Sequence, residues 1–239
     1  MKRFSFALIA MLLLSPGLGC AADKTVSGDL VYQQDFAKAD ALGDFVFASP
    51  EDFRRVKVGD RWAMEYGNDS RKSEYKPPHR SPLYIGLIRD IKVASFRLEY
   101  DVQQRSQTGN HRDHCVFFNF EDPANFFYTH IAKKSDPHAH QIMNVDDAPR
   151  KAITKKGTDG YDWASMDQWH HVKVIREADS GLIAIYVNDM DTPIMTTHSK
   201  AHDIGYVGFG SFDDLGRVSN IKLWAPKVIR ENAPFFKQK

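Results

Sequence analysis

Residues 94–103 read ASFRLEYDVQ, and every even-numbered position in this stretch is apolar while every odd-numbered position is polar. A period of two is the period of a β-strand, whose successive side chains point to opposite faces of a sheet. One face of this strand is therefore expected to be buried, and the other is expected to contact water. The stretch predicts a sheet that gives one of its faces to a hydrophobic core.

Similar patterns recur along the chain, and short turn sequences such as Gly59-Asp60 and Asn188-Asp189 separate them. The further expected strands are 29–36, 52–58, 61–66, 114–120, 125–132, 139–145, 168–177, 181–188, 204–212 and 217–224. No helical pattern extends beyond about two turns. Many short strands with regular turns predict an all-β fold, a two-sheet antiparallel sandwich over residues 23–225. Residues 226–239 are expected to form a surface or disordered tail.

The N-terminus has the three parts of an export signal. Lys2 and Arg3 are followed by the apolar stretch 4–14 and then by small residues, which predicts a signal peptide over residues 1–22. The apolar stretch is shorter than the about 20 residues that span a bilayer, and no later segment is apolar enough to cross one. In the alternative interpretation, Cys20 is a lipid-anchored first residue, but Gly17-Leu18-Gly19 is a poor lipid-attachment motif. Export to the periplasm, the envelope or the medium is expected.

Charge limits the expected partners, and cysteine content limits the expected disulfides. Removal of residues 1–22 takes away Lys2 and Arg3, so 30 basic and 31 acidic residues remain, a balance of −1. This balance gives no electrostatic reason to expect nucleic acid or an anionic membrane as a partner. Only Cys115 would survive signal removal, so an internal disulfide is excluded and a buried, inert thiol is expected.

The last third of the chain carries a recognisable order of motifs. Residues 169–176 read WHHVKVIR, 181–189 read GLIAIYVND, 205–210 read GYVGFG and 218–224 read VSNIKLW. This order resembles the concanavalin A-like jelly rolls, and residues 31–36 resemble the first strand of that superfamily, which pairs with the last. The nearest whole-chain resemblance is to the 3-keto-disaccharide hydrolase domain family.

The resemblance implies a jelly-roll fold and a carbohydrate ligand, because glycosidases, polysaccharide lyases and laminin G-like modules share this superfamily. The sequence lacks the E-x-D-x-x-E motif of laminarinase-type glycosidases, and it lacks the R-x-E-x-R and Y-x-K-x-G-x-Y motifs of jelly-roll lyases. A retaining glycosidase needs two carboxyl groups about 5–5.5 Å apart. The acids available near strand ends are Asp113, Glu121, Asp122, Asp146 and Asp147.

Residues 111–150 hold the most unusual chemistry. Five of the ten histidines lie within 30 positions, at 111, 114, 130, 138 and 140. Tyr128 and His130 are two apart and are expected to share a strand face. If neighbouring strands align, Asn119 and His140 would converge with them on the concave face of one sheet. In the alternative interpretation, each of these residues is a satisfied structural or surface side chain, and Tyr128 only packs against the sheet.

The cluster suggests roles in sugar chemistry. His130 is the expected acid–base residue with Tyr128 as its partner, because the pKa of histidine lies near neutrality. Asn119, His140, Gln141, Arg150 and Arg112 are expected to hold the substrate, and Trp163 in its loop is expected to stack on a sugar ring. His140 and Gln141 alternate along a strand, so only one of them should share the face unless a bulge intervenes.

No metal or other cofactor is expected to be required. His138 and His140 could bind a transition metal only with a third ligand from elsewhere. The resemblance allows a structural calcium at Asp213 or Asp214 with oxygens near Asp35, for which turn formation is the simpler interpretation. The leading hypothesis is an exported enzyme that cleaves a glycosidic linkage in a poly- or oligosaccharide, as a hydrolase or a lyase. The alternatives are a non-catalytic glycan-binding module and a structural or adhesive envelope protein.

Overall fold

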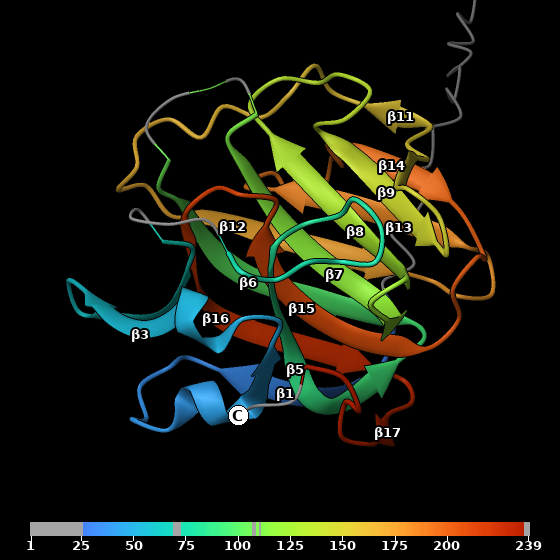
Figure 1. Ribbon diagram of the computed structural model, residues 1–239. Helices are drawn as coiled ribbons and strands as arrows, with labels where there is room; N and C mark the ends of the chain where they lie inside the picture. The colour runs from blue at the N-terminus through green and yellow to red at the C-terminus, as the bar shows by residue number, and fades with distance from the viewer. Residues whose placement is uncertain (1–25, 69–72, 107–108, 110, 237–239) are drawn as a thin grey trace, which may run out of the picture.

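The computed structural model describes residues 26–68, 73–106, 109 and 111–236, and these fold into two antiparallel sheets packed face to face (Figure 1). The predicted two-sheet antiparallel sandwich is confirmed. The expected signal peptide, residues 1–22, lies outside the described residues. In the part of the chain that the structure describes, no helix is long and apolar enough to cross a membrane.

Within the described ranges, one sheet has nine strands and the other has eight. The order of the nine-stranded sheet is β11 (Lys156–Gly157), β14 (Met195–His198), β13 (Leu182–Val187), β12 (His170–Arg176), β6 (Phe96–Gln104), β16 (Gly216–Ala225), β4 (Arg61–Tyr66) and β3 (Phe53–Val58), with β1 (Asp29–Gln34) also paired to β16. The order of the eight-stranded sheet is β10 (Lys151–Ala152), β9 (Gln141–Asp146), β8 (Asn125–Ala132), β7 (Asp113–Asp122), β15 (Gly205–Ser211), β5 (Tyr84–Val93) and β17 (Ile229–Arg230), with β2 (Phe45–Phe47) also paired to β5. Two short 3-10 helices, η1 (Ala41–Asp44) and η2 (Pro50–Asp52), flank β2. The pairing of β1 with β16 is the first-to-last pairing that the resemblance implies.

The main core lies between the two sheets. Strand β6 shows the expected alternation, because Phe96, Leu98 and Tyr100 are fully buried while Arg97 and Glu99 on the other face are partly exposed. Burial of each such apolar side chain contributes roughly 1.5–3 kcal/mol.

A buried histidine joins the two sheets inside this core. His114 of β7 lies between the hydroxyl groups of Tyr66 on β4 and Tyr100 on β6, with both oxygen-to-nitrogen distances 2.7 Å. Burial lowers the pKa of His114 to about 3, so the ring is neutral and one nitrogen donates while the other accepts. His114, one of the five clustered histidines, therefore has a structural role in the core.

The eight-stranded sheet is also covered on its outer face. A second apolar cluster lies there, around Phe117, Tyr128 and Met143, and Tyr75 and Phe236 pack against it from outside the sheet. Cys115 belongs to this cluster, and burial raises the pKa of its thiol, as an inert cysteine requires. The tail segment 226–236 follows this sheet, because β17 pairs with β5 and Phe236 contacts Phe120.

Burial on both faces explains why β5 was not predicted. Residues 84–93 read YIGLIRDIKV and have no alternation, because the first five residues of the strand are all buried. A strand covered on both faces needs apolar side chains at consecutive positions. The short strand β14 was also missed.

Two glycines of β15 let the strands of this sheet approach closely. A Cβ atom on Gly210 would overlap the carbonyl oxygen of Tyr84, and one on Gly208 would overlap the carbonyl oxygen of Gly86. The glycines of the GYVGFG motif are therefore required by packing against β5.

We predict that Gly210→Ala destabilises the fold by about 1–3 kcal/mol, since the added methyl group must displace backbone. Gly43→Ala is the matched control, because a Cβ atom added at Gly43 would have no other atom within 4 Å. Its effect should stay within about 0.5 kcal/mol. Urea unfolding of both variants measures the difference, and equal midpoints would contradict the packing constraint.

Candidate functional site

The side chains of Tyr128 and His130 lie on the outer face of the eight-stranded sheet, as their spacing of two requires. Their ring centroids are 6.5 Å apart. On the neighbouring strand β7, Cys115 is opposite His130 and Phe117 is opposite Tyr128. This end of the outer face carries polar groups, beside the apolar cluster that covers its middle.

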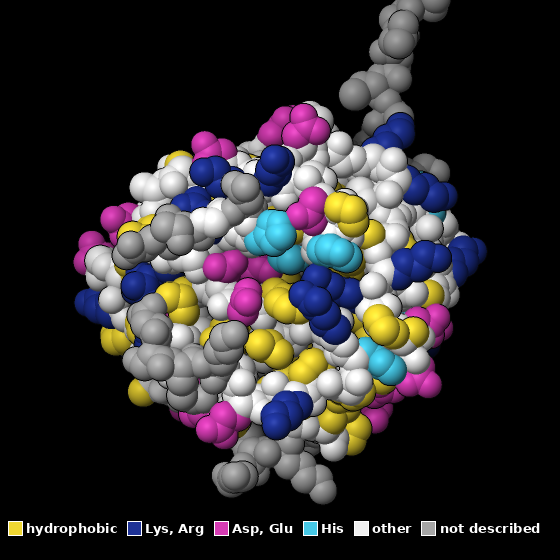
Figure 2. Space-filling view, turned by 45° about the horizontal axis from the view of Figure 1, so that its top comes forward, with side chains coloured by type: hydrophobic (Ala, Val, Ile, Leu, Met, Phe, Trp, Pro, Cys, Tyr) yellow, Lys and Arg dark blue, Asp and Glu magenta, His cyan; other side chains and the backbone are white. Residues whose placement is uncertain are grey.

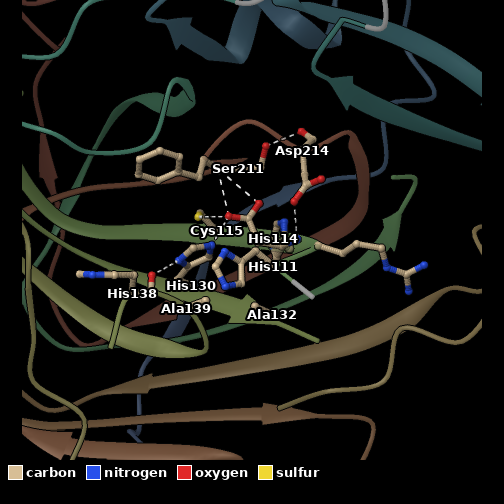
Figure 3. A network of polar contacts seen from close by, with 12 residues as sticks. His111, His114, Cys115, His130, Ala132, His138, Ala139, Ser211 and Asp214 are labelled. Atoms are coloured by element: carbon tan, nitrogen blue, oxygen red, sulfur yellow. Dashed lines mark hydrogen bonds and ion pairs between the residues drawn. The ribbon is translucent and has the colours of Figure 1, made fainter. Parts of the chain in front are cut away.

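His130 is held between two acceptors (Figure 3). Its Nδ1 donates to the carbonyl oxygen of His138 at 2.7 Å, and its Nε2 contacts the carboxylate of Asp113. The His130 and Asp113 side chains are 5 % and 1 % exposed. Burial alone would lower the pKa of His130, but the charge and hydrogen bond of Asp113 outweigh it, so the pKa is raised. His130 and Asp113 therefore form a buried ion pair.

This pair restricts what His130 can do. Both ring nitrogens are engaged and the side chain is buried, so this conformation offers no nitrogen to a ligand. The acid–base role predicted for His130 is therefore not supported by the geometry. Tyr128 is also buried, its hydroxyl accepts a hydrogen bond from Nη1 of Arg150 at 3.0 Å, and burial raises its pKa.

An accessible layer lies above the buried pair. The ring of Phe212 stacks on His130 with a centroid distance of 6.1 Å. The guanidinium carbons of Arg150 and Arg80 lie 4.3 Å and 5.7 Å from the Phe212 ring centroid. Figure 2 shows histidine, acidic and basic side chains gathered near the middle of this side of the molecule. In this layer the side chain of Arg80 is exposed and that of Arg150 is half-buried.

The loop 133–140 forms the rim of the site and is ordered by Asp136. One carboxylate oxygen of Asp136 accepts from the backbone N–H groups of His138 and Ala139, at 2.6 and 2.8 Å, and the other contacts Nε2 of His111 at 2.5 Å. The side-chain amide of Gln141 donates to the Asp136 carbonyl at 2.9 Å. The side chains of His111 and His138 are exposed, and Gln141 pairs in register with His130. Gln141 is therefore the member of the alternating pair that lies beside His130.

Asp214 is a titratable residue that the sequence did not mark for this site. Its carboxylate accepts from the backbone N–H of Asp113 at 2.7 Å. Burial and the nearby charge of Asp113 raise the pKa of Asp214 to about 7. No local motif could reveal this, because Asp113 is 101 positions away in the chain. A carboxyl group that gains and loses a proton near neutrality can serve as an acid or a base.

Asn119 does not join the site, and its predicted convergence with Tyr128 is wrong. The register of β7 shifts between Phe118 and Asp122, and Asn119 takes a positive φ of 44°. Its amide nitrogen donates to three backbone carbonyl groups, including that of Ala94 at 3.2 Å, and its oxygen accepts from Nε of Arg176 at 3.1 Å. A β-bulge thus directs this side chain into a structural hydrogen-bond network.

Trp163 is fully buried, so its predicted role as a sugar-stacking platform is wrong. Its indole N–H donates to the Arg112 carbonyl at 3.0 Å, and its ring packs against Tyr161 and His170. Arg112 is itself buried, and its Nε has no hydrogen-bond partner within the described ranges.

His140 is buried too, with a φ of 54°, and it contacts the Thr158 hydroxyl at 2.9 Å. Burial lowers the pKa of His140 to about 4. Neither His140 nor Arg112 is placed to meet a ligand.

The side chains considered as possible metal ligands are not brought together. Across residues 26–68, 73–106, 109 and 111–236, no three His, Cys, Asp or Glu side chains form a group that could hold a metal ion. Asp35 follows the end of β1 that pairs with Ile221 in the middle of β16, whereas Asp214 precedes the start of β16. A calcium ion shared by Asp35 and Asp214 has no support from this arrangement.

Comparison with known proteins supports the fold. No protein-family model matches the chain, and no curated protein sequence matches it. The carbohydrate-binding module CBM66 from Bacillus subtilis superposes with a TM-score of 0.53 at 12 % identity, over 76 % of this chain and 96 % of that one. A Bacillus subtilis protein of unknown function with a galectin-like fold gives 0.56 at 10 %, over 86 % and 100 %. Peanut lectin gives 0.52 at 12 %, over 84 % and 98 %.

These neighbours confirm the concanavalin A-like jelly roll that the motif order indicates. At these identities the likeness concerns the fold alone. The narrower resemblance to the 3-keto-disaccharide hydrolase domain family stays a prediction, because no family model matches.

We predict that His130→Ala destabilises the protein by about 3–5 kcal/mol, since it leaves the buried Asp113 carboxylate without its partner. His138→Ala is the matched control, because His138 contributes its backbone carbonyl and its side chain is exposed. Urea unfolding at pH 7 measures both variants. A His130→Ala protein as stable as the control would contradict the ion pair.

We predict that Asp214→Asn flattens the pH dependence of the melting temperature. The folded-state pKa of about 7 lies above the reference value of 3.8, so the folded state holds this proton more tightly than the unfolded chain. The resulting stability is complete below about pH 4 and is lost as pH rises through 7. From pH 5 to pH 8 the melting temperature of the original protein should therefore fall further than that of the variant. Parallel curves would refute the raised pKa.

Proposed function

We propose that this protein is exported and binds a poly- or oligosaccharide at the polar end of the outer face of the eight-stranded sheet. One observation carries the proposal: exposed and half-buried hydrogen-bonding side chains from separate segments lie at Phe212 and on the neighbouring Asp136 loop, beside a buried polar network. These side chains are Arg80, His111, His138, Gln141 and Arg150. Planar polar groups with several donors suit the hydroxyl-rich surface of a sugar.

The network beneath these side chains supports binding by holding them in place. Asp136 fixes the loop that carries His138, and the ion pair of His130 with Asp113 lies under Phe212. A surface that is ordered before the ligand arrives loses less conformational freedom on binding. The fold shared with a carbohydrate-binding module and a lectin is consistent with this function, as an analogy of fold.

Cleavage of a glycosidic linkage is the second candidate function, and one observation favours it. The Asp214 carboxyl group has a pKa raised to about 7 beside a second acid, Asp113. A carboxyl group that holds a proton near neutral pH can donate it to a leaving group. In this scheme Asp214, rather than His130, donates the proton. Asp113 is buried and paired with His130, which favours binding as the first candidate.

A screen of the purified mature protein separates the two functions. Plant, algal and microbial polysaccharides are tested for retention of the protein, release of reducing ends and absorbance of unsaturated uronates. Retention alone supports the binding protein. Reducing ends without the absorbance indicate hydrolysis, and both signals together indicate a lyase. Turnover that survives Asp214→Asn would remove Asp214 from the mechanism, and absence of both retention and turnover would refute a carbohydrate function.

We predict that His138→Ala weakens binding of the best glycan from that screen about tenfold, the effect of about 1.4 kcal/mol that one lost hydrogen bond can have. The melting temperature should be unchanged, because the side chain is exposed. His198→Ala is the matched control, since His198 is an exposed histidine on β14 of the other sheet. Titration calorimetry measures both affinities. An equal loss in the two variants, or none in either, would contradict this placement of the site.

A further inference from the structure

Two arginines beside the proposed glycan site lack an acidic partner among the described residues. The guanidinium carbons of Arg80 and Arg150 lie 5.7 Å and 4.3 Å from the same Phe212 ring centroid. They are therefore at most 10.0 Å apart, the sum of the two distances. Within the part of the chain that the structure describes, Arg150 has one hydrogen bond, to the neutral hydroxyl of Tyr128, and neither arginine forms an ion pair.

Three arginines on the opposite sheet have carboxylate partners, whereas Arg55, stacked on Trp62, donates to two backbone carbonyl groups instead. Arg97 contacts Glu99 at 3.5 Å, Arg61 contacts Asp101 at 2.8 Å, and Arg217 contacts Glu65 at 2.5 Å. Arg97 also lies over an aromatic ring, that of Trp224, at 4.0 Å. An arginine stacked on an aromatic ring in this protein can therefore also have a carboxylate partner, and the pair at Phe212 has none within the described ranges.

Acidic groups near Phe212 are already engaged. Asp113 is paired with His130, and Asp136 contacts His111. Asp214 accepts a backbone hydrogen bond and takes up a proton near neutral pH. Asp213 also has an interaction partner of its own. Arg80 and Arg150 are therefore cationic groups at the accessible layer of the site that have no carboxylate partner among the described residues.

We infer that the saccharide bound at this site is acidic, and that Arg80 and Arg150 bind its carboxylate or sulfate groups. The inference rests on the proposed glycan-binding function and specifies its ligand class. A guanidinium group matches the planar carboxylate, and also the sulfate oxygens, with two parallel N–H donors. Two such receptors within 10.0 Å of each other can engage anionic groups on the same or neighbouring sugars of one chain. The even charge balance of the whole chain does not oppose this, because the two guanidinium groups would contact the ligand directly.

The test compares three probes by titration calorimetry on the full mature protein: oligogalacturonate with carboxylates, chondroitin sulfate oligomers with sulfates, and neutral laminari-oligosaccharides. The acidic probe that fits should bind at least about tenfold more tightly than the neutral one, and its affinity should fall as salt is added. Arg80→Gln and Arg150→Gln should each weaken acidic binding about tenfold, and the double variant about a hundredfold. The preferred acidic probe identifies the anionic group.

Arg97→Gln is the matched control, because it removes a ring-stacked guanidinium from the opposite sheet and should leave acidic binding unchanged. Melting temperatures of all four variants show whether they fold. Neutral probes that bind as well as acidic ones, with no effect of either arginine, would overturn the acidic ligand and leave glycan binding in place. Binding of none of these probes, together with failure of the wider polysaccharide screen, would overturn the proposed function and this inference with it.

Discussion

The arrangement of this protein depends on one constraint, which is that the eight-stranded sheet is covered on both of its faces. The inner face packs on the nine-stranded sheet, and the outer face is covered by Tyr75 and by the phenylalanines of the C-terminal segment. The end near Phe212 has polar side chains within reach of solvent, above polar groups that are buried. Groups below that end are enclosed and must satisfy one another, which is why Asp113 and His130 are paired. The location of the site is therefore set by what the rest of the sheet must bury.

The sequence predicted those parts of the fold that depend on local periodicity. The alternation at 94–103 identified β6, and the spacing of Tyr128 and His130 placed both on one face. Strand β5 was not predicted because both of its faces are buried, so its apolar residues do not alternate with polar ones. Asn119 and His140 were misplaced because each has a positive φ, which redirects the side chain and leaves no mark in a pattern of apolar residues. Trp163 lies in a loop, as expected, but its side chain fills the core instead of contacting solvent.

The candidate site was harder to predict because its chemistry comes from contacts distant in sequence. The raised pKa of Asp214 depends on Asp113, and the position of Arg150 depends on Tyr128 and Phe212. The histidine cluster lies in the region of the candidate site, but its members have different roles. His114 and His140 are structural, His130 is paired in the floor of the site, and His111 and His138 lie on the rim. A count of histidines could not separate these tasks, because only burial and partners distinguish them.

The neutral imidazole of His114 between two tyrosines has a consequence for how this sequence can diverge. Loss of Tyr66 or Tyr100 would leave one ring nitrogen enclosed without a partner, whereas replacement of all three residues by apolar ones of similar size would leave none. The three positions are therefore expected to show strong epistasis, with single substitutions costing more than the complete exchange. Related chains should keep the trio intact or lose it as a unit.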